Sequence, residues 1–358
     1  MMTRRDATQL RSAMPHALPF FMFLIVLAPV LLGHQLGGAW TFLTPFALFG
    51  VLGSFDLLVG RGETGGYPKS DSPVHRFAIL LWLPIQIALI VWLLWLVANN
   101  LLTPLEIVGM TLSIGTVSGA IGIVFAHELT HRITWLERRF ADALMVSVSY
   151  HHFCIEHVHG HHRTVGTKED PATARLNESF YRFFPRATLG GFASAWHLEA
   201  IRMRRRTRSS FHWRNRVLTG VIVQAAMYVA AGSIFGWLAV PVLAGLGLVA
   251  VFQLEVINYL EHYGLERRSL ADGRLERMAP HHSWDDNHIL SSWLLINLTH
   301  HADHHMRPGE RYQRLGMIPG AAMLPFGYAT TFLFVLAPPI WFRMMNPRVE
   351  ALRAVYPV

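Results

Sequence analysis

The chain has 358 residues, of which 52% are hydrophobic and 15% are charged, against about 25% charged residues in an average soluble domain. This composition excludes a disordered chain, which would carry little apolar surface and much charge. The single cysteine, Cys154, excludes a disulfide framework and any cluster held by four cysteines. The net charge is +8, but no nucleic-acid motif accompanies it. We therefore assign the basic residues to the flanks of membrane spans and expect no nucleic-acid partner.

Six apolar stretches can be read as membrane spans, since crossing a bilayer takes about 20 mainly apolar residues. Three of them contain no charged residue, and the other three carry one acid each: Asp56, Glu106 and Glu255. The sequence therefore predicts an all-α integral membrane protein with six transmembrane helices. The predicted spans are 18–33, 40–60, 77–98, 104–126, 217–239 and 241–260.

Lysine and arginine are distributed unevenly among the connections between these spans. They precede the first span and are dense from Arg132 to Arg216, but 34–39, 99–103 and position 240 contain none. Under the positive-inside rule, both termini and all long loops are cytoplasmic, as in a multi-pass protein of a bacterial-type inner membrane. The N-terminal stretch lacks a signal-peptide cleavage site, so we predict a retained span. The whole chain, 1–358, is then one membrane domain with cytoplasmic catalytic segments 127–216 and 261–358.

Segment 317–342 is a seventh apolar stretch. It is uncharged but contains four prolines, and crossing the bilayer would place three later arginines on the outside. We predict instead a helix that lies on, or partly enters, the cytoplasmic leaflet.

Histidine is unusually frequent, with 21 residues. Three pairs have i,i+4 spacing, namely His127/His131, His157/His161 and His301/His305, and residues three or four apart share one helix face. Each cluster can therefore aim two or three imidazoles at one point. His262 ends a span at the same membrane depth as His127. The predicted metal ligands are His127, His131, His157, His161, His162, His262, His301, His304 and His305.

Nine nitrogen ligands are too many for one ion, because zinc sites take three or four protein ligands. Nine ligands divide into five plus four, or a similar split, around two ions. Imidazole binds iron, zinc, copper and nickel, so ligand type alone does not identify the metal.

Acidic and amide side chains near these histidines are candidate supporting groups. Metal-bound imidazoles usually donate their second N–H to a carboxylate or carbonyl, and we expect Glu128, Glu261 and Asp303 to act in this way. Other polar residues could either join the site or serve only in packing and hydrogen bonding. They are Glu255, Asn258, Asp56, His159, His282 and His300.

Four motifs carry a family resemblance: HELTH, EHVHGHH, NYLEHYGL and LTHHADHH, with EDPATAR and HSWDDNHI between them. On these motifs the chain resembles the integral-membrane alkane monooxygenases, within the membrane di-iron desaturase and hydroxylase superfamily. NYLEHYGL is the most discriminating motif, since desaturases generally lack it. Xylene monooxygenases share much of the pattern.

The resemblance implies a six-helix fold with a di-iron centre, two Fe2+/Fe3+ ions, held by the nine histidines at the cytoplasmic end. It also implies O2-dependent hydroxylation of the terminal methyl of an alkane or related apolar chain. Electrons would come from rubredoxin or ferredoxin and its reductase. No flavin or nicotinamide fingerprint is present in the chain itself, which agrees with an external donor.

Other interpretations stay open at this point. A fatty-acid desaturase or a xylene or alkyl-aromatic monooxygenase would use the same superfamily site. His127-Glu128-x-x-His131 also matches the HExxH motif of zinc proteases, but such a site has no use for seven more histidines. A metal transporter would place its ion site near the bilayer midplane, whereas these clusters lie at the inner boundary.

Two further surfaces are tied to this function. Trp82, Phe125, Leu129 and Trp135 are either linings of a substrate channel or ordinary packing residues. A basic run would either dock an acidic electron carrier or bind anionic lipid. It comprises Arg202, Arg204, Arg205, Arg206 and Arg208.

Overall fold

The computed structural model describes residues 16–62 and 72–356. The basic residues before the first span (Arg4, Arg5 and Arg11) and Lys69 contribute to the predicted orientation but lie outside the described residues.

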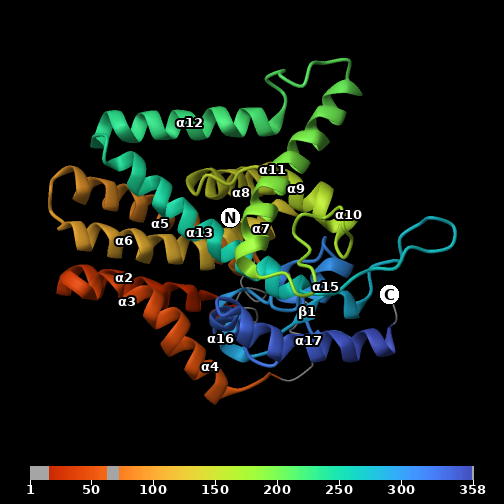
Figure 1. Ribbon diagram of the computed structural model, residues 1–358. Helices are drawn as coiled ribbons and strands as arrows, with labels where there is room; N and C mark the ends of the chain where they lie inside the picture. Colours follow the sequence, from red (N-terminus) through yellow and green to blue (C-terminus); the bar gives the residue numbers. More distant parts are fainter. Residues whose placement is uncertain (1–15, 63–71, 357–358) are drawn as a thin grey trace, which may run out of the picture.

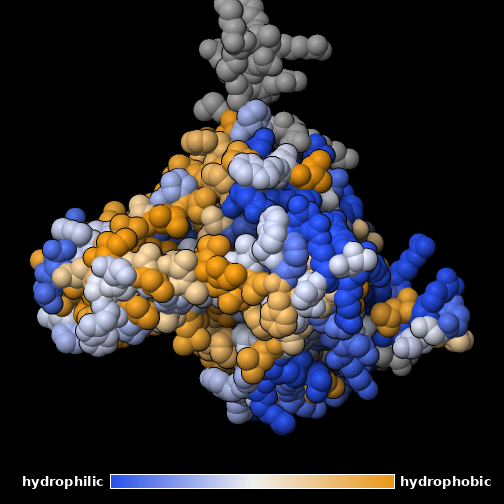
Figure 2. Space-filling model, turned by 90° about the horizontal axis from the view of Figure 1, so that it is seen from above, coloured by the Kyte–Doolittle hydropathy of each residue, from blue (hydrophilic) through white to orange (hydrophobic). Residues whose placement is uncertain are grey.

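The six predicted spans are confirmed, with ends that move by a few residues. Figure 1 shows the long helices running in roughly the same direction as one bundle, and Figure 2 shows hydrophobic surface over this part and hydrophilic surface concentrated at one end. The spans are Leu18–Leu36, Gly38–Val59, α5 (Pro73–Ala98), Pro104–Thr130, α12 (Arg216–Phe235) and α13 (Ala239–His262).

Three of the spans change helix type along their length. The first is a 3-10 helix followed by α2 (Leu27–Leu36). The second contains α3 (Leu43–Pro45), a π-helical turn and α4 (Gly53–Val59). The fourth runs through α6 (Pro104–Val117), a π-helical turn at Ser118–Ile123, and α7 (Val124–Thr130). This last turn lies directly before the first histidine motif, and π turns are frequent at functional sites.

Local sequence signals fix several span ends. Thr103 and Glu106 form a capping box at the start of α6, which explains the acid predicted inside this span. The Asn215 side chain accepts hydrogen bonds from the first amides of α12. Span 5 ends at Phe235 rather than at 239, because Gly236 has φ 84° and leaves the helical conformation. The connection between spans 5 and 6 is therefore 236–238 instead of position 240.

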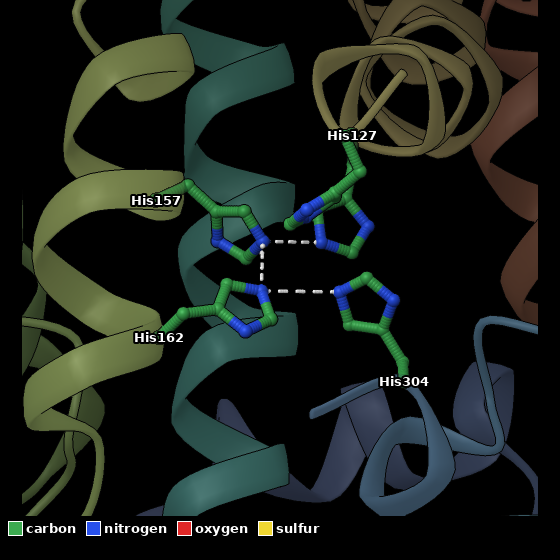
Figure 3. Close-up of side chains that lie close together, drawn as sticks. His127, His157, His162 and His304 are labelled. Atoms are coloured by element: carbon green, nitrogen blue, oxygen red, sulfur yellow. Dashed lines mark hydrogen bonds between the residues drawn. The ribbon is translucent and has the colours of Figure 1, made fainter. Parts of the chain in front are cut away.

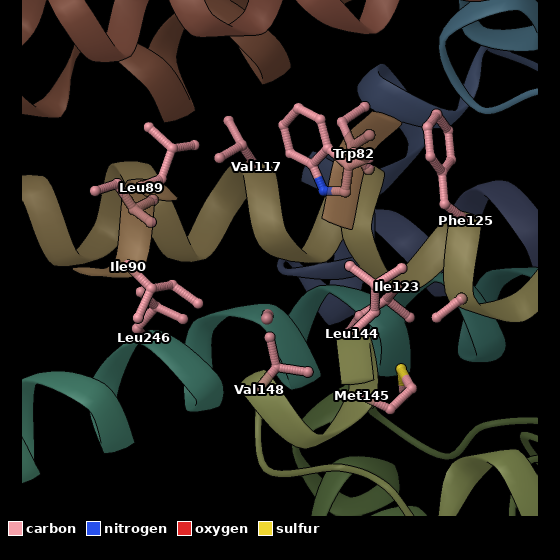
Figure 4. Close-up of a cluster of buried hydrophobic side chains, with 14 of the residues drawn as sticks. Trp82, Leu89, Ile90, Val117, Ile123, Phe125, Leu144, Met145, Val148 and Leu246 are labelled. Carbon is pink, nitrogen blue, oxygen red and sulfur yellow. The ribbon is translucent and has the colours of Figure 1, made fainter. Parts of the chain in front are cut away.

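The interior of the bundle is close-packed and apolar. Figure 4 shows Trp82, Phe125 and their neighbours interdigitating between spans 3, 4 and 6. The Trp82 indole donates to Gln86, and Gln86 donates to Ser147 at 2.7 Å, so these buried polar groups are paired. Trp82, Phe125 and Leu129 are thus packing residues of this core, while Trp135 is 72% exposed.

The remaining helices and a small sheet lie mainly at one end of the bundle (Figure 1). A two-stranded parallel sheet pairs Trp284 with Ala322, and α16 packs against α13 while α11 packs against both α9 and α13. The elements are α8 (Trp135–Ser147), α9 (Phe153–Glu156), α10 (His162–Thr164), α11 (Phe180–Arg204), β1 (Trp284–Asp285), α14 (Ile289–Leu294), α15 (His301–Met306), β2 (Ala322–Met323), α16 (Tyr328–Val335) and α17 (Pro338–Val355).

Segment 317–342 is not among the spans found in the described residues. It is also not the single helix predicted from the sequence. It contains β2, α16 and the start of α17, with a break at Ala337, because the Pro338–Pro339 pair can begin a helix but cannot continue one.

The orientation can be tested by labelling thiols introduced into the connections. We expect Asn100→Cys and Trp237→Cys to react with a membrane-impermeant maleimide in intact cells, and Arg206→Cys to react only after lysis. The native Cys154 should react little with the maleimide, because burial raises the pKa of its thiol to about 12. Labelling of Arg206→Cys in intact cells would contradict the predicted orientation.

Candidate metal centre

Five histidines from three parts of the chain converge at the covered end of the bundle. His127 and His131 come from the end of span 4, His157 and His162 from the next motif, and His304 from α15. Figure 3 shows four of these rings with their nitrogens turned toward one another. The Nε2 atoms are 2.6 Å apart for His127 and His157, 3.0 Å for His157 and His162, and 3.2 Å for His162 and His304.

The other four histidines form a second group. His301 and His305 lie on α15, His262 ends α13, and His161 comes from the second motif. The Nε2 atom of His301 lies 3.2 Å from Nε2 of His262 and 2.9 Å from Nε2 of His305. In each group, one ligand atom per residue lies within 4.8 Å of all the others. The predicted division into five and four is therefore present in the geometry.

One predicted pairing is wrong. The i,i+4 spacing of His157 and His161 led us to expect a shared target, but His157 lies in the first group and His161 in the second. The cause is a π-helical turn at His157–His161. A π-helix has i→i+5 hydrogen bonds and therefore a wider turn than an α-helix, and here Nε2 of His157 lies 3.0 Å from Nε2 of His162 instead.

The nitrogen atoms of these rings fit metal ligation through Nε2. Seven of the nine Nε2 atoms face another Nε2, and those of His131 and His161 are buried without a hydrogen-bond partner among the described residues. Seven of the nine rings lie outside the spans. Burial holds the pKa of six of these imidazoles well below its usual value, and His161 is the exception. A neutral imidazole offers the lone pair that a metal requires.

His161 is held by a buried carboxylate that the sequence analysis did not single out. Its Nδ1 lies 2.9 Å from Oδ2 of Asp170, which also accepts a hydrogen bond from the Thr173 hydroxyl. Burial alone would lower the pKa of His161, but the Asp170 carboxylate outweighs it and the pKa is raised. Asp170 belongs to the EDPATAR motif, which was the sequence signal that could have identified it as a site residue. The contact directs Nε2 of His161 into the second group.

The three predicted supporting carboxylates have different surroundings. Glu261 lies 3.3 Å from Nδ1 of His301 and accepts a hydrogen bond from the Tyr328 hydroxyl. Glu128 instead pairs with Arg132 and accepts from the backbone of Tyr312. Asp303 pairs with Arg307 and accepts from the backbone of Gly316. Of these three carboxylates, only Glu261 therefore contacts a histidine of the two groups among the described residues.

Glu255 and Asn258 lie next to the histidine groups. Glu255 accepts hydrogen bonds from Tyr150 and Asn258. Both line a small polar hollow of about 320 Å³ that also reaches His157 and His161.

The other additional candidates lie outside the two groups. Asp56 accepts hydrogen bonds from Leu290 and Ser291 and lies with Asp286 and His288. His282 lies with His281 and Glu276, and His159 is only half-buried. His300 is buried just before α15, and burial lowers its pKa to about 4.

An apolar cavity of about 910 Å³ extends from the histidines into the bundle. His127, His157 and His301 lie at one end, and spans 2, 4 and 6 contribute most of the remaining wall together with α14 and α16. Trp82, Phe125, Leu129 and Trp135 are not among the cavity's lining residues.

The fold and the site together define a membrane protein with a histidine-rich metal centre at the end of an apolar cavity. The fatty acid desaturase family model matches residues 102–335. Alkane 1-monooxygenase 2 of Pseudomonas aeruginosa is 37% identical over 332 residues, which cover 90% of this chain and 88% of that protein. Alkane 1-monooxygenase of Acinetobacter baylyi is 33% identical over 85% of this chain and 76% of its own length.

A more distant relative is the xylene/toluene monooxygenase hydroxylase component of Pseudomonas putida, 29% identical over 92% of this chain and 87% of that protein. The chain belongs to the alkane 1-monooxygenase family, within the fatty acid desaturase family. It is therefore an oxidoreductase with a metal centre.

The role of Asp170 can be tested through metal retention. We expect Asp170→Asn to weaken metal binding by roughly 10- to 100-fold, because it removes the carboxylate that orients His161. Metal content after a graded chelator challenge measures the effect. Glu169→Gln is the matched control, because Glu169 is the exposed neighbour. Equal metal retention by the two variants would contradict this role.

Proposed function

We propose that this protein is an O2-dependent di-iron monooxygenase that hydroxylates the terminal methyl of alkanes or related apolar chains. The observation that carries the proposal is the apolar cavity, which has three histidines of the two groups at its end. The family relationship supports the same chemistry.

The two histidine groups would each hold one iron ion. His127, His131, His157, His162 and His304 would hold the first, and His161, His262, His301 and His305 the second. Bound iron would supply the reduction of O2 and the oxidising power for an unactivated C–H bond, which no side chain provides.

The protein's own contribution is to position the substrate and exclude water. Leu48, Ile123 and Leu294 are among the apolar side chains that line the cavity. A linear chain lying along it can bring only its end to the histidines, so the terminal methyl reacts although its C–H bonds are stronger than internal ones. Tyr328 and Glu261 line the histidine end, and their hydrogen bond at 2.8 Å fixes the carboxylate beside His301.

Turnover requires electrons from outside the chain, and we propose rubredoxin or ferredoxin with its reductase as donor. The basic run from Arg202 to Arg208 is one docking surface for an acidic carrier. Its neighbours favour the lipid alternative, because Phe211 and Trp213 are 75% and 69% exposed just before α12 begins. Exposed aromatic residues beside arginines are typical of a membrane interface.

The membrane placement follows the same reasoning. We propose a bacterial-type inner membrane, with both termini and the metal centre on the cytoplasmic side, where a soluble carrier can reach it. An apolar substrate can then enter from the lipid bilayer.

Product analysis tests the proposed function. Membranes that contain the protein, a reduced donor system and n-dodecane should form 1-dodecanol with one oxygen atom from labelled O2. His304→Ala should abolish this product, because His304 lies in the first histidine group. His159→Ala is the matched control and should retain activity.

Three outcomes would contradict the proposal. Internal alcohols as the main products would remove the positioning argument. An alkene without incorporated oxygen would place the chain among desaturases, and preferred oxidation of xylenes would favour the alkyl-aromatic branch.

A further inference from the structure

One polar side chain lies in the wall of the apolar cavity without a partner. Gln253 of α13 is only 5% exposed and lines the cavity with Leu254 and Ile257. Its side-chain amide has no hydrogen bond to any described residue. The contrast is Gln86 in span 3, a buried glutamine whose amide both accepts from Trp82 and donates to Ser147. The amide is not among the buried side-chain atoms that lack a partner, so it is accessible from the cavity, where a ligand can hydrogen-bond to it.

The position of Gln253 is set by close packing against span 4. A Cβ atom on Gly119 would lie 3.1 Å from the amide carbon of Gln253, so the glycine leaves room for this amide. Both residues line the cavity. Gly119 belongs to the π-helical turn that precedes His127 by eight residues.

Gln253 lies toward the end of the cavity that is remote from the histidines. It precedes His262 by nine residues on the same helix, which corresponds to about 14 Å at 1.5 Å per residue. An extended hydrocarbon advances about 1.3 Å per carbon, given a bond of about 1.5 Å. The amide is therefore about ten carbons from a methyl group placed at the metal centre.

The charges in the cavity limit what the amide can bind. The lining residues include Glu261 and three histidines but no lysine or arginine. A carboxylate substrate would have no cationic partner in this apolar space, which disfavours a free fatty acid. A neutral carbonyl or hydroxyl oxygen can accept a hydrogen bond from the amide N–H without that cost.

We propose that Gln253 selects chains that carry a neutral oxygen function about ten carbons from the methyl that reacts. Medium-chain acyl esters and alcohols share this chemistry. The inference rests on the proposed hydroxylase function and specifies its substrate class. The reaction at the methyl end is unchanged: one oxygen atom of O2 enters the C–H bond, and the other leaves as water with two electrons from the external donor and two protons.

The test compares methyl decanoate with n-dodecane, which has the same number of non-hydrogen atoms along the chain. The wild type should show a higher kcat/KM for the ester, by roughly three- to tenfold for one neutral hydrogen bond. In a series of methyl esters, this preference should be greatest near ten acyl carbons. A parallel series with 1-decanol and its homologues separates the alcohol from the ester.

Gln253→Leu should reduce the ester-to-alkane ratio to about one or below while terminal hydroxylation of dodecane continues, since a lost neutral hydrogen bond is worth only several-fold. Gln253→Met provides a second apolar variant, and metal content confirms that each variant is folded. Gln224→Leu is the matched control, because Gln224 lies on α12 and is not among the cavity's lining residues. It should retain the wild-type ratio.

An unchanged ratio in both Gln253 variants would overturn this inference and leave the proposed function standing. The same holds for a wild type that prefers dodecane to every ester and alcohol. A wild type that hydroxylates none of these compounds would overturn the proposed function, and this inference with it.

Discussion

The crowding of nine imidazole rings in a buried space is the constraint on which the rest of this structure depends. Burial lowers the pKa of most of these rings and keeps them neutral, and several of their nitrogens lack a hydrogen-bond partner among the described residues. Each such buried polar atom costs roughly 1–3 kcal/mol. Metal binding through Nε2 would remove that cost at His131 and His161, and it would add its own free energy to folding. The histidine motifs therefore have to be held together by strong packing elsewhere, which the apolar bundle supplies.

The bundle also explains why a hydrophobic cavity and a polar metal centre can adjoin each other. Spans 4 and 6 each end in a histidine motif, while their preceding turns are apolar and line the cavity. One pair of helices thus contributes both the metal ligands and the wall along which a substrate lies. On the other side, Asn258 and His157 separate the cavity from a small polar hollow that contains Glu156 and Glu255. The centre is accessible to apolar molecules on one side and to polar groups on the other.

The sequence was sufficient for the features that depend on local composition and spacing. Span existence follows from apolar length, and the need for two metal ions follows from nine histidines being too many ligands for one. The assignment of His157 and His161 could not be predicted, because it depends on a π-helical turn at His157–His161 where the spacing alone indicates an α-helix. Asp170 lies nine residues from His161 and meets it only through the folded loop. For Glu128 and Asp303, the i,i+4 arginines Arg132 and Arg307 were a local signal for ion pairing.

The most direct measurement of the central claim is the metal content of the purified protein. Iron and zinc per chain should be determined together by elemental analysis, on protein purified without added chelator after growth with sufficient iron. The account predicts two iron ions per chain, with little zinc. One zinc ion per chain without iron, or a single iron that does not increase on reconstitution, would contradict a centre built from two histidine groups.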